Sequence, residues 1–249
     1  MTTRVDPRLA ERRRTVAEGN ARKRLRRILW ALLVVSLVAA VGWVAQSPWF
    51  SIAHVAVSGV GGSDAHRILE TNGIVEGTPL ISVAPRRVEA LLQEDPWIAD
   101  ATVRRVIPDA IEVVVKERIP FAWVQMGKGW AVIAEDLTVL RNDGQPTGPS
   151  LVIEVSAHGR GDRVKDPRVI GGVTFLAGLP IDTRNQVSLA EQDGELWADV
   201  GGLAVRLGLP TEMKEKAAAL LAILGEGIPS GSVVNLVAPT RPAVVEPSP

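Results

Sequence analysis

The sequence IEVVVKERIPFAW, residues 111–123, begins with the pattern of a β-strand and continues across the predicted end of a structural unit at residue 118. Ile111, Val113 and Val115 stand at alternate positions, and side chains two residues apart lie on the same face of a strand. The turn sequence IPDA, residues 107–110, comes directly before and indicates that this strand is the second of a hairpin. Because an apolar sheet face has to be covered, we expect helices of the same unit to lie on it.

Two helices and a further strand are predicted upstream of this hairpin. Apolar residues at alternate positions predict a strand over residues 52–57. Ser63 is a candidate N-cap for a helix over residues 64–71, and Pro85 is typical of the first turn of a second helix. The order strand–helix–helix–strand–strand predicts a compact α+β unit over residues 50–118.

Downstream, residues 119–246 predict a second, mixed β-rich unit with two helices. We expect Pro167 to begin the first helix and Thr211 to cap the second, whose apolar side chains recur at helical spacing up to Gly225. Turn-forming residues separate short apolar runs, and such runs are typical of strands. The predicted strands are 124–126, 130–133, 137–140, 151–155, 187–190, 196–200, 203–207, 233–237 and 243–245. Residues 247–249 are left as a C-terminal tail.

The run ILWALLVVSLVAAVGWVA, residues 28–45, contains no charged residue and no proline. As a helix it would be about 27 Å long, close to the roughly 30 Å thickness of a bilayer's hydrocarbon core. The basic sequence RKRLRR, residues 22–27, precedes it, and basic residues collect on the cytoplasmic side of a membrane. We therefore predict a single transmembrane helix in the cell (inner) membrane, with a cytoplasmic N-terminus. A cleaved signal peptide, with cleavage after Ala40, is the alternative.

Charge is distributed unevenly along the chain. Residues 1–27 contain ten Arg or Lys and three Asp or Glu, so their net charge is +7, and the remainder of this neutral chain carries −7. The composition of this basic tail indicates disorder and attraction to anionic lipid headgroups. Because the tail has no aromatic side chains to stack on bases, we do not expect it to bind nucleic acid.

Several short motifs follow one another in the predicted α+β unit. They are FSIxxVxVxG at 50–59, GxPL at 77–80, DPWI at 95–98 and RxxPxxIxVxV at 105–115. In this order the motifs resemble those of a POTRA domain. The resemblance implies a β-α-α-β-β fold for residues 50–118.

The segment that joins the two predicted units resembles a more specific family. The pattern VxVxERxPxAW at 113–123, placed after a single apolar segment and a POTRA-like unit, is similar to that of the FtsQ/DivIB family of bacterial cell-division proteins. In residues 119–246, the motif GxxVxLG at 202–208 and Lys214 match the β-domain of that family. Asn235 stands where the family often has Asp.

This resemblance implies a non-catalytic, membrane-anchored scaffold of the divisome at the division septum, linking early and late division proteins. It implies that the POTRA domain helps to bring the protein to the division site, and that the end of the β-domain binds the periplasmic part of FtsB in the FtsB–FtsL pair. Since an edge strand presents unpaired backbone groups, we expect binding by strand addition at the last two strands. The residues in the matching region are Val237, Ala238, Thr240, Ala243, Val244 and Val245.

The residues that could carry chemistry do not form a recognisable site. The chain has no cysteine, which excludes disulfides, thiolate metal sites and a cysteine nucleophile, and its three histidines are far apart in sequence. The carboxylates of Asp162, Asp166, Glu191 and Asp193 are expected to be solvated in loops. We therefore predict no catalytic residue, cofactor, metal or small-molecule substrate. Two alternatives stay open: a POTRA-bearing component of an envelope transport or assembly machine, and a secreted enzyme with a cleaved signal peptide.

Overall fold

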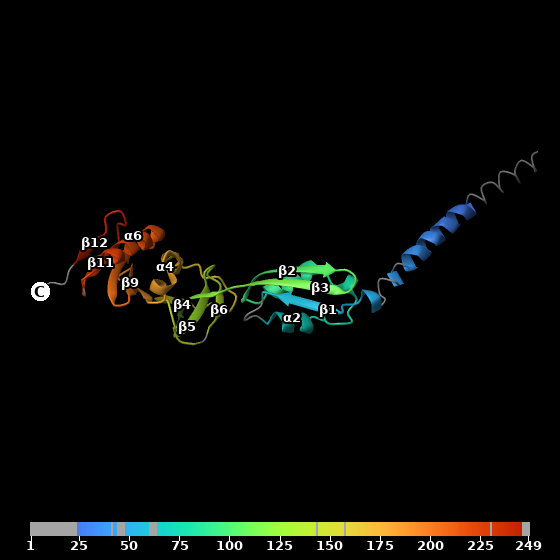
Figure 1. Cartoon of the computed structure of the whole chain (residues 1–249), viewed down its shortest axis with the longest axis horizontal. Helices are drawn as coiled ribbons and strands as arrows, with labels where there is room; N and C mark the ends of the chain where they lie inside the picture. The colour runs from blue at the N-terminus through green and yellow to red at the C-terminus, as the bar shows by residue number, and fades with distance from the viewer. Residues whose placement is uncertain are drawn as a thin grey trace, which may run out of the picture. The chain divides into compact units, whose positions relative to one another are not determined.

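The computed structural model describes residues 24–40, 42–43, 48–59, 64–142, 144–156, 158–229 and 231–245 (Figure 1). Packing divides the chain into two compact units. Among the described residues, one unit contains the segments 69–85 and 103–113 together with those up to 56. The other unit contains the segments 57–59, 64–68 and 86–102 together with the described residues from 114 onward. The predicted domain ranges 50–118, 119–246 and 247–249 stay predictions.

A three-stranded sheet and two helices follow the predicted order strand–helix–helix–strand–strand. The elements are β1 (His54–Ser58), α2 (Ala65–Thr71), α3 (Pro85–Gln93), β2 (Ile98–Val106) and β3 (Ala110–Glu117), with short 3₁₀ helices η1 (Pro48–Phe50) and η2 (Leu80–Ser82). The sheet order is β1-β3-β2, so the quoted strand lies in the centre. Ile111, Val113 and Val115 are all buried, which confirms the predicted apolar face. Ser63, the predicted cap, lies outside the described residues.

The N-terminal part of the chain is described only from residue 24. Residues 24–40 are helical, and their large apolar side chains are exposed. Within the described part of the chain, no helix is both long and apolar enough to span a membrane. The predicted span 28–45 includes residues 41, 44 and 45, and the predicted tail includes residues 1–23; all of these lie outside the described residues.

The second sheet is mixed and has nine strands, in the order β12-β11-β10-β9-β8-β7-β4-β5-β6. The strands are β4 (Pro120–Met126), β5 (Gly129–Ala134), β6 (Val139–Arg141), β7 (Ser150–Val155), β8 (Val187–Gln192), β9 (Glu195–Val200), β10 (Leu203–Gly208), β11 (Val233–Asn235) and β12 (Ala243–Val245). All nine predicted strands are present, with shifts of a few residues at their ends.

The helices of this sheet differ in detail from the prediction of two. The described residues contain α4 (Pro167–Ala177), α6 (Met213–Glu226) and a third helix, α5 (Ile181–Arg184), which is too short for helical spacing to reveal. The prediction that Thr211 caps α6 is wrong. Glu212 occupies the N-cap with φ 53° and makes no side-chain cap hydrogen bond, and the helix ends at Glu226 rather than Gly225.

Two helical crossovers set the sheet topology. The chain passes from β7 through α4 and α5 to β8, and from β10 through α6 to β11, and both pairs of strands are parallel. Parallel neighbours need such long connections, whereas antiparallel neighbours such as β8 and β9 need only a tight turn. Side chains from α4, α6 and one face of the sheet form a single core, which includes Phe175, Leu176, Ala217 and Leu220.

Arg118 follows β3 and ties neighbouring segments of the second unit together. Its guanidinium donates to the carbonyl oxygens of Pro96 (3.0 Å) and Ile98 (2.7 Å) and to the carboxylate of Asp136 (2.8 Å). Burial would raise the pKa of Asp136, but hydrogen bonds from Arg118 and Thr138 outweigh it and lower the pKa. The Arg of the Glu-Arg-x-Pro motif is therefore a structural residue with three partners.

Glycines in α4 and at its C-cap allow close approach of other elements. A Cβ built on Gly171 would lie 2.6 Å from Cβ of Pro210 and 3.2 Å from its Cα, and a Cβ on Gly178 would lie 2.7 Å from Cβ of Ala217. Such distances are shorter than van der Waals contact, so α4 fits here only because these positions lack a side chain. By contrast, a Cβ on Gly225, near the end of α6, would meet nothing within 4 Å.

We expect Gly171→Ala to lower the free energy of unfolding by about 1–3 kcal/mol, since the added methyl group has to displace the segment at Pro210. Gly225→Ala is the matched control and should raise it by up to about 1 kcal/mol, because alanine has the higher helix propensity. Urea unfolding followed by circular dichroism measures both. Equal effects of the two substitutions would contradict the packing described for α4.

Candidate functional site

The nine-stranded sheet has two edge strands, and one of them is covered. At β6, Thr138 forms a bridge with Arg163. The N–H of Val139 donates to the carbonyl of Asp162 (2.9 Å), and the N–H of Gly161 donates to the carbonyl of Val139 (2.8 Å). The chain segment 159–164 therefore satisfies backbone groups along the outer side of β6. This edge offers little to another strand.

The opposite edge, β12, is open within the described part of the chain. Its three residues pair with β11 on one side, and no described strand lies on the other side. Ala243, Val244 and Val245 are all exposed. A strand at an open edge presents N–H and C=O groups that an extended segment from another protein can pair with.

The hydrogen-bond pattern identifies which backbone groups of β12 face outward. The N–H of Leu236 donates to the carbonyl of Arg206 in β10 (2.8 Å), so along this strand the backbone groups of Val234 also point toward β10. Val234 lies opposite Val244 in the antiparallel register. Val244 is therefore at a non-hydrogen-bonded position of the β11–β12 pair, and its N–H and C=O point away from β11.

The six sequence-predicted residues come together in one β11–turn–β12 hairpin. Ala243, Val244 and Val245 form β12, whereas Val237, Ala238 and Thr240 lie in the turn and are exposed. The N–H of Val237 donates to the side-chain oxygen of Asn235 (3.1 Å), and the N–H of Arg241 donates to the carbonyl of Ala238 (3.0 Å). Asn235, which departs from the family's usual Asp, thus retains an acceptor oxygen at the end of β11.

Buried residues beneath the hairpin hold it in place. Val234 and Leu236 are fully buried in the core of the sheet. Val237 packs over Gly208, which has φ 71° and where a Cβ would lie 3.0 Å from a methyl group of Val237. The position of the open edge therefore depends on the core under β11 and on the absence of a side chain at Gly208.

A polar row crosses the sheet face beside the hairpin. Arg206 in β10 donates to both carboxylate oxygens of Glu195 in β9, at 2.6 Å and 3.0 Å, and its guanidinium lies 6.0 Å from the ring centroid of Trp197. Asn235 is the next residue in this row, since it is in register with Arg206. Hydrogen bonding to Arg206 lowers the pKa of Glu195. The residue of β12 in register with Asn235 is Ala243, so the polar row ends one strand before the open edge.

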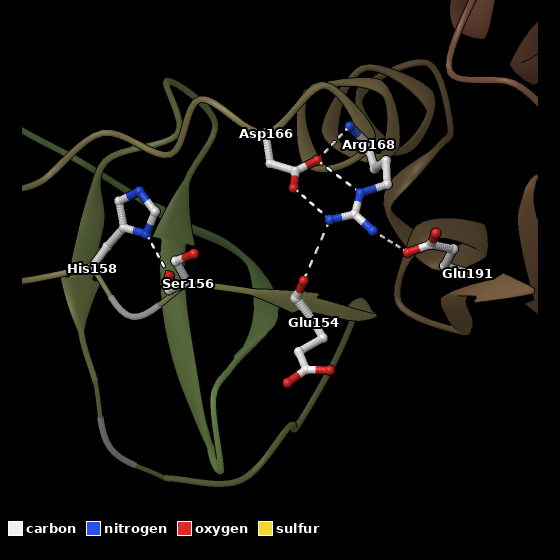
Figure 2. Close-up of polar contacts among 6 residues, drawn as sticks. All are labelled: Glu154, Ser156, His158, Asp166, Arg168 and Glu191. Carbon is white, nitrogen blue, oxygen red and sulfur yellow. Dashed lines mark hydrogen bonds and ion pairs between the residues drawn. The ribbon is translucent and has the colours of Figure 1, made fainter. Parts of the chain in front are cut away.

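A cluster around Arg168 corrects the expectation that Asp166 and Glu191 are merely solvated (Figure 2). The carboxylate of Asp166 accepts the backbone N–H of Arg168 at 2.8 Å and so caps α4. The Arg168 guanidinium pairs with Asp166 and Glu191 and donates to the carbonyl of Glu154 at 3.4 Å. Because Glu154 lies in β7 and Glu191 in β8, the cluster fastens the start of α4 to two strands of the sheet.

Lys216 is a residue whose importance the sequence analysis missed. It stands three residues after Met213, so helical spacing puts it on the buried side of α6, and its side chain is almost completely buried. The ammonium group donates to the carbonyl of Leu209 at 2.9 Å. Burial lowers the pKa of Lys216, and the nearby carboxylate of Glu212 partly opposes that shift. Lys216 thus holds the turn between β10 and α6.

Residues that commonly bind metal ions do not gather in one place within the described residues. In that part of the chain, no three His, Cys, Asp or Glu residues lie close enough together to hold a metal ion. His158 contacts the carbonyl of Ser156 at 2.7 Å (Figure 2), and Asp162 accepts the N–H of Gly159 at 2.7 Å. The contacts of these two residues are local, so the open β12 edge remains the best candidate site.

Together, the β-α-α-β-β order and the mixed sheet with an open last strand define a protein with a POTRA-type α+β unit and a β-rich unit. Residues 50–118 match the model of the FtsQ-type POTRA domain. The chain belongs to the FtsQ/DivIB family of bacterial cell-division proteins, as the following relatives show.

Three relatives illustrate the extent of the similarity. The cell division protein FtsQ of Anaeromyxobacter sp. (strain K) is 30% identical over 237 residues, which cover 89% of this chain and 78% of the relative. FtsQ of Streptomyces coelicolor is 30% identical over 88% of each chain. FtsQ of Corynebacterium glutamicum is 27% identical over 196 residues, covering 77% of this chain and 87% of the relative. A role in cell division follows from this membership.

The Arg168 cluster predicts a pH-dependent contribution to stability. Hydrogen bonding from Arg168 lowers the pKa of Asp166 in the folded protein. Because the folded-state pKa lies below that of the unfolded chain, this stabilisation is present at neutral pH and is lost as the pH falls through the folded pKa. Asp166→Asn keeps a capping side chain but removes the charge. At about pH 7 the wild type should therefore have the higher free energy of unfolding, and this advantage should shrink by about 1 kcal/mol between about pH 7 and about pH 3.

Urea unfolding at both pH values measures this difference. Asp193→Asn, in the exposed turn between β8 and β9, is the control for removing one negative charge. A wild-type advantage over Asp166→Asn that stays constant with pH would contradict the role assigned to Asp166.

Proposed function

We propose that this protein is a non-catalytic, membrane-anchored scaffold of the divisome that binds the FtsB–FtsL pair by strand addition at β12. In this role it links early and late division proteins, and the POTRA domain helps to bring it to the division site. The observation that carries the proposal is the open β12 edge, at the hairpin that contains all six predicted contact residues. Membership of the FtsQ/DivIB family supports the division role.

The contrast between the two edges of the sheet supports β12 as the binding position. The segment 159–164 covers β6, whereas the backbone groups of Val244 point away from the sheet. Each backbone hydrogen bond gained in strand addition contributes about 0.5–1.5 kcal/mol. Exposed Val244 and Val245 add apolar surface for alternate side chains of the added strand.

Anchoring in the cell membrane, with the N-terminus in the cytoplasm and the later residues outside, forms part of the proposal. Residues 28–45 carry no charge, and the described helical residues 24–40 expose large apolar side chains to fractions of 52–65%. Such a surface calls for a partner or a lipid environment. The basic residues 22–27 before it favour a cytoplasmic N-terminus.

Val244→Pro tests strand addition most directly. Proline removes the outward N–H of Val244 but no hydrogen bond of the β11–β12 pair. We expect affinity for the purified periplasmic part of the FtsB–FtsL pair to fall at least about tenfold, since pairing is lost and the strand is distorted. Deletion after Pro239 should abolish binding. Isothermal titration calorimetry measures the affinity, and circular dichroism checks the fold.

Val244→Thr is the matched control, because it keeps the backbone donor and a β-branched side chain. Its affinity should stay within about threefold of the wild type. Wild-type affinity in a folded Val244→Pro variant would overturn binding at this edge.

Localisation tests the anchor and the division role in the living cell. A fusion with a fluorescent protein at the N-terminus should form a band at midcell. Leu33→Arg combined with Val34→Arg should move the protein out of the membrane fraction, because each charge at the centre of a span costs about 2.5–3.5 kcal/mol. A uniform envelope signal argues against the division role. A mature protein about 40 residues short would show instead that the apolar run is a cleaved signal.

A further inference from the structure

Exposed apolar side chains gather at the end of the first compact unit where the chain enters from the apolar run. Six large apolar side chains are exposed among the described residues between 48 and 118. Five of them lie on three short segments at this end. They are Trp49, Val75, Ile81, Val106 and Ile107, and the sixth, Val114, lies on the sheet. We call these five residues the apolar tip.

Hydrogen bonds show that the three segments are neighbours. Ser51 bridges to Pro79, and the N–H of Ile52 donates to the carbonyl of Thr78 at 2.9 Å. The N–H of Ala53 donates to the carbonyl of Asp109 at 2.7 Å, which places the β2–β3 turn beside the entering chain. The guanidinium of Arg105 donates through Nε to the carbonyl of Val83 at 2.8 Å and so joins the turn to η2.

All five residues of the apolar tip belong to one compact unit. The exposed fractions are high: 84% for Trp49, 77% for Ile107 and 59% for Ile81. Exposed apolar residues scattered singly need no explanation, but a contiguous group on a small unit marks a contact surface. We therefore expect a partner to cover the apolar tip.

We propose that the apolar tip inserts into the headgroup–acyl boundary of the same membrane that anchors the chain. This inference rests on the proposed anchoring through residues 28–45. Three residues, 46–48, separate Trp49 from the end of that run at Ala45. The four Cα–Cα steps between them keep Trp49 within about 14 Å of it however the chain turns. Tryptophan is enriched at the membrane–water interface, where its ring is apolar and its N–H stays hydrated.

Charge around the tip fits shallow insertion rather than electrostatic adsorption. Arg104 and Arg105 precede Val106, and the acidic residues Glu76 and Asp109 lie on the neighbouring turns, so these groups balance. The driving force is therefore apolar burial, which salt screens little. A weak insertion is sufficient, because the tether keeps the tip at an effective concentration of the order of millimolar near the surface.

The experiment uses the full chain in vesicles of phosphatidylcholine and phosphatidylglycerol. The sequence has no cysteine, so Ile107→Cys provides a single position for a nitrobenzoxadiazole label. Lipids that carry a nitroxide near the headgroup should quench this label strongly, and quenching should persist in about 0.5 M salt. Glu112→Cys, two residues beyond Ala110 and so roughly 7 Å beyond the start of β3, is the matched control and should be quenched much less.

Further variants assign the insertion to the tip. Trp49→Ser combined with Ile81→Ser should reduce quenching at position 107 at least about threefold, because two large apolar side chains leave the interface. Equal quenching at positions 107 and 112 in protein that floats with the vesicles would overturn the inference while leaving the anchor intact. Protein that fails to float with the vesicles would overturn the proposed anchor, and the inference with it.

Discussion

Unpaired backbone groups at the two edges of the nine-stranded sheet limit how such a sheet can end. A sheet that is not closed into a barrel has two edges, and each must be covered, blunted or used. Here the segment 159–164 covers β6, whereas β12 is left open with three exposed residues. The two edges of the sheet therefore differ: the edge at β6 is covered, and the edge at β12 can accept another strand.

Packing of the neighbouring strand β11 against the core holds the open edge in place. The crossover through α6 brings β11 parallel to β10, and Val234 and Leu236 anchor β11 in the core. Lys216 inside this crossover fixes the turn at Leu209, and Gly208 makes room for Val237. Because these buried contacts hold the hairpin, we expect substitutions of its exposed side chains to leave β12 in place as an open edge strand.

The charged side chains described here mainly stabilise the fold by joining separate elements. Arg168 joins the start of α4 to β7 and β8, and Arg118 joins the end of β3 to the segment 96–98 and to Asp136. In each case the guanidinium has several acceptors at once, including backbone carbonyls. This use of charge agrees with a protein that works through contacts between surfaces.

Local patterns in the sequence predict the strand–helix–helix–strand–strand order, the nine later strands and the hairpin that carries the candidate site, because alternating and helical spacing of apolar residues is a local property. The folded chain alone shows that β12 is an open edge while β6 is covered, that Val244 faces outward, and that Lys216 and Asp166 have hydrogen-bond partners. These features depend on register and on contacts between residues far apart in the chain, which no local pattern encodes. Thr211 failed as a cap for the same reason: the close packing at Pro210 and the bond from Lys216 to Leu209 fix that turn, rather than the local preference for a hydroxyl.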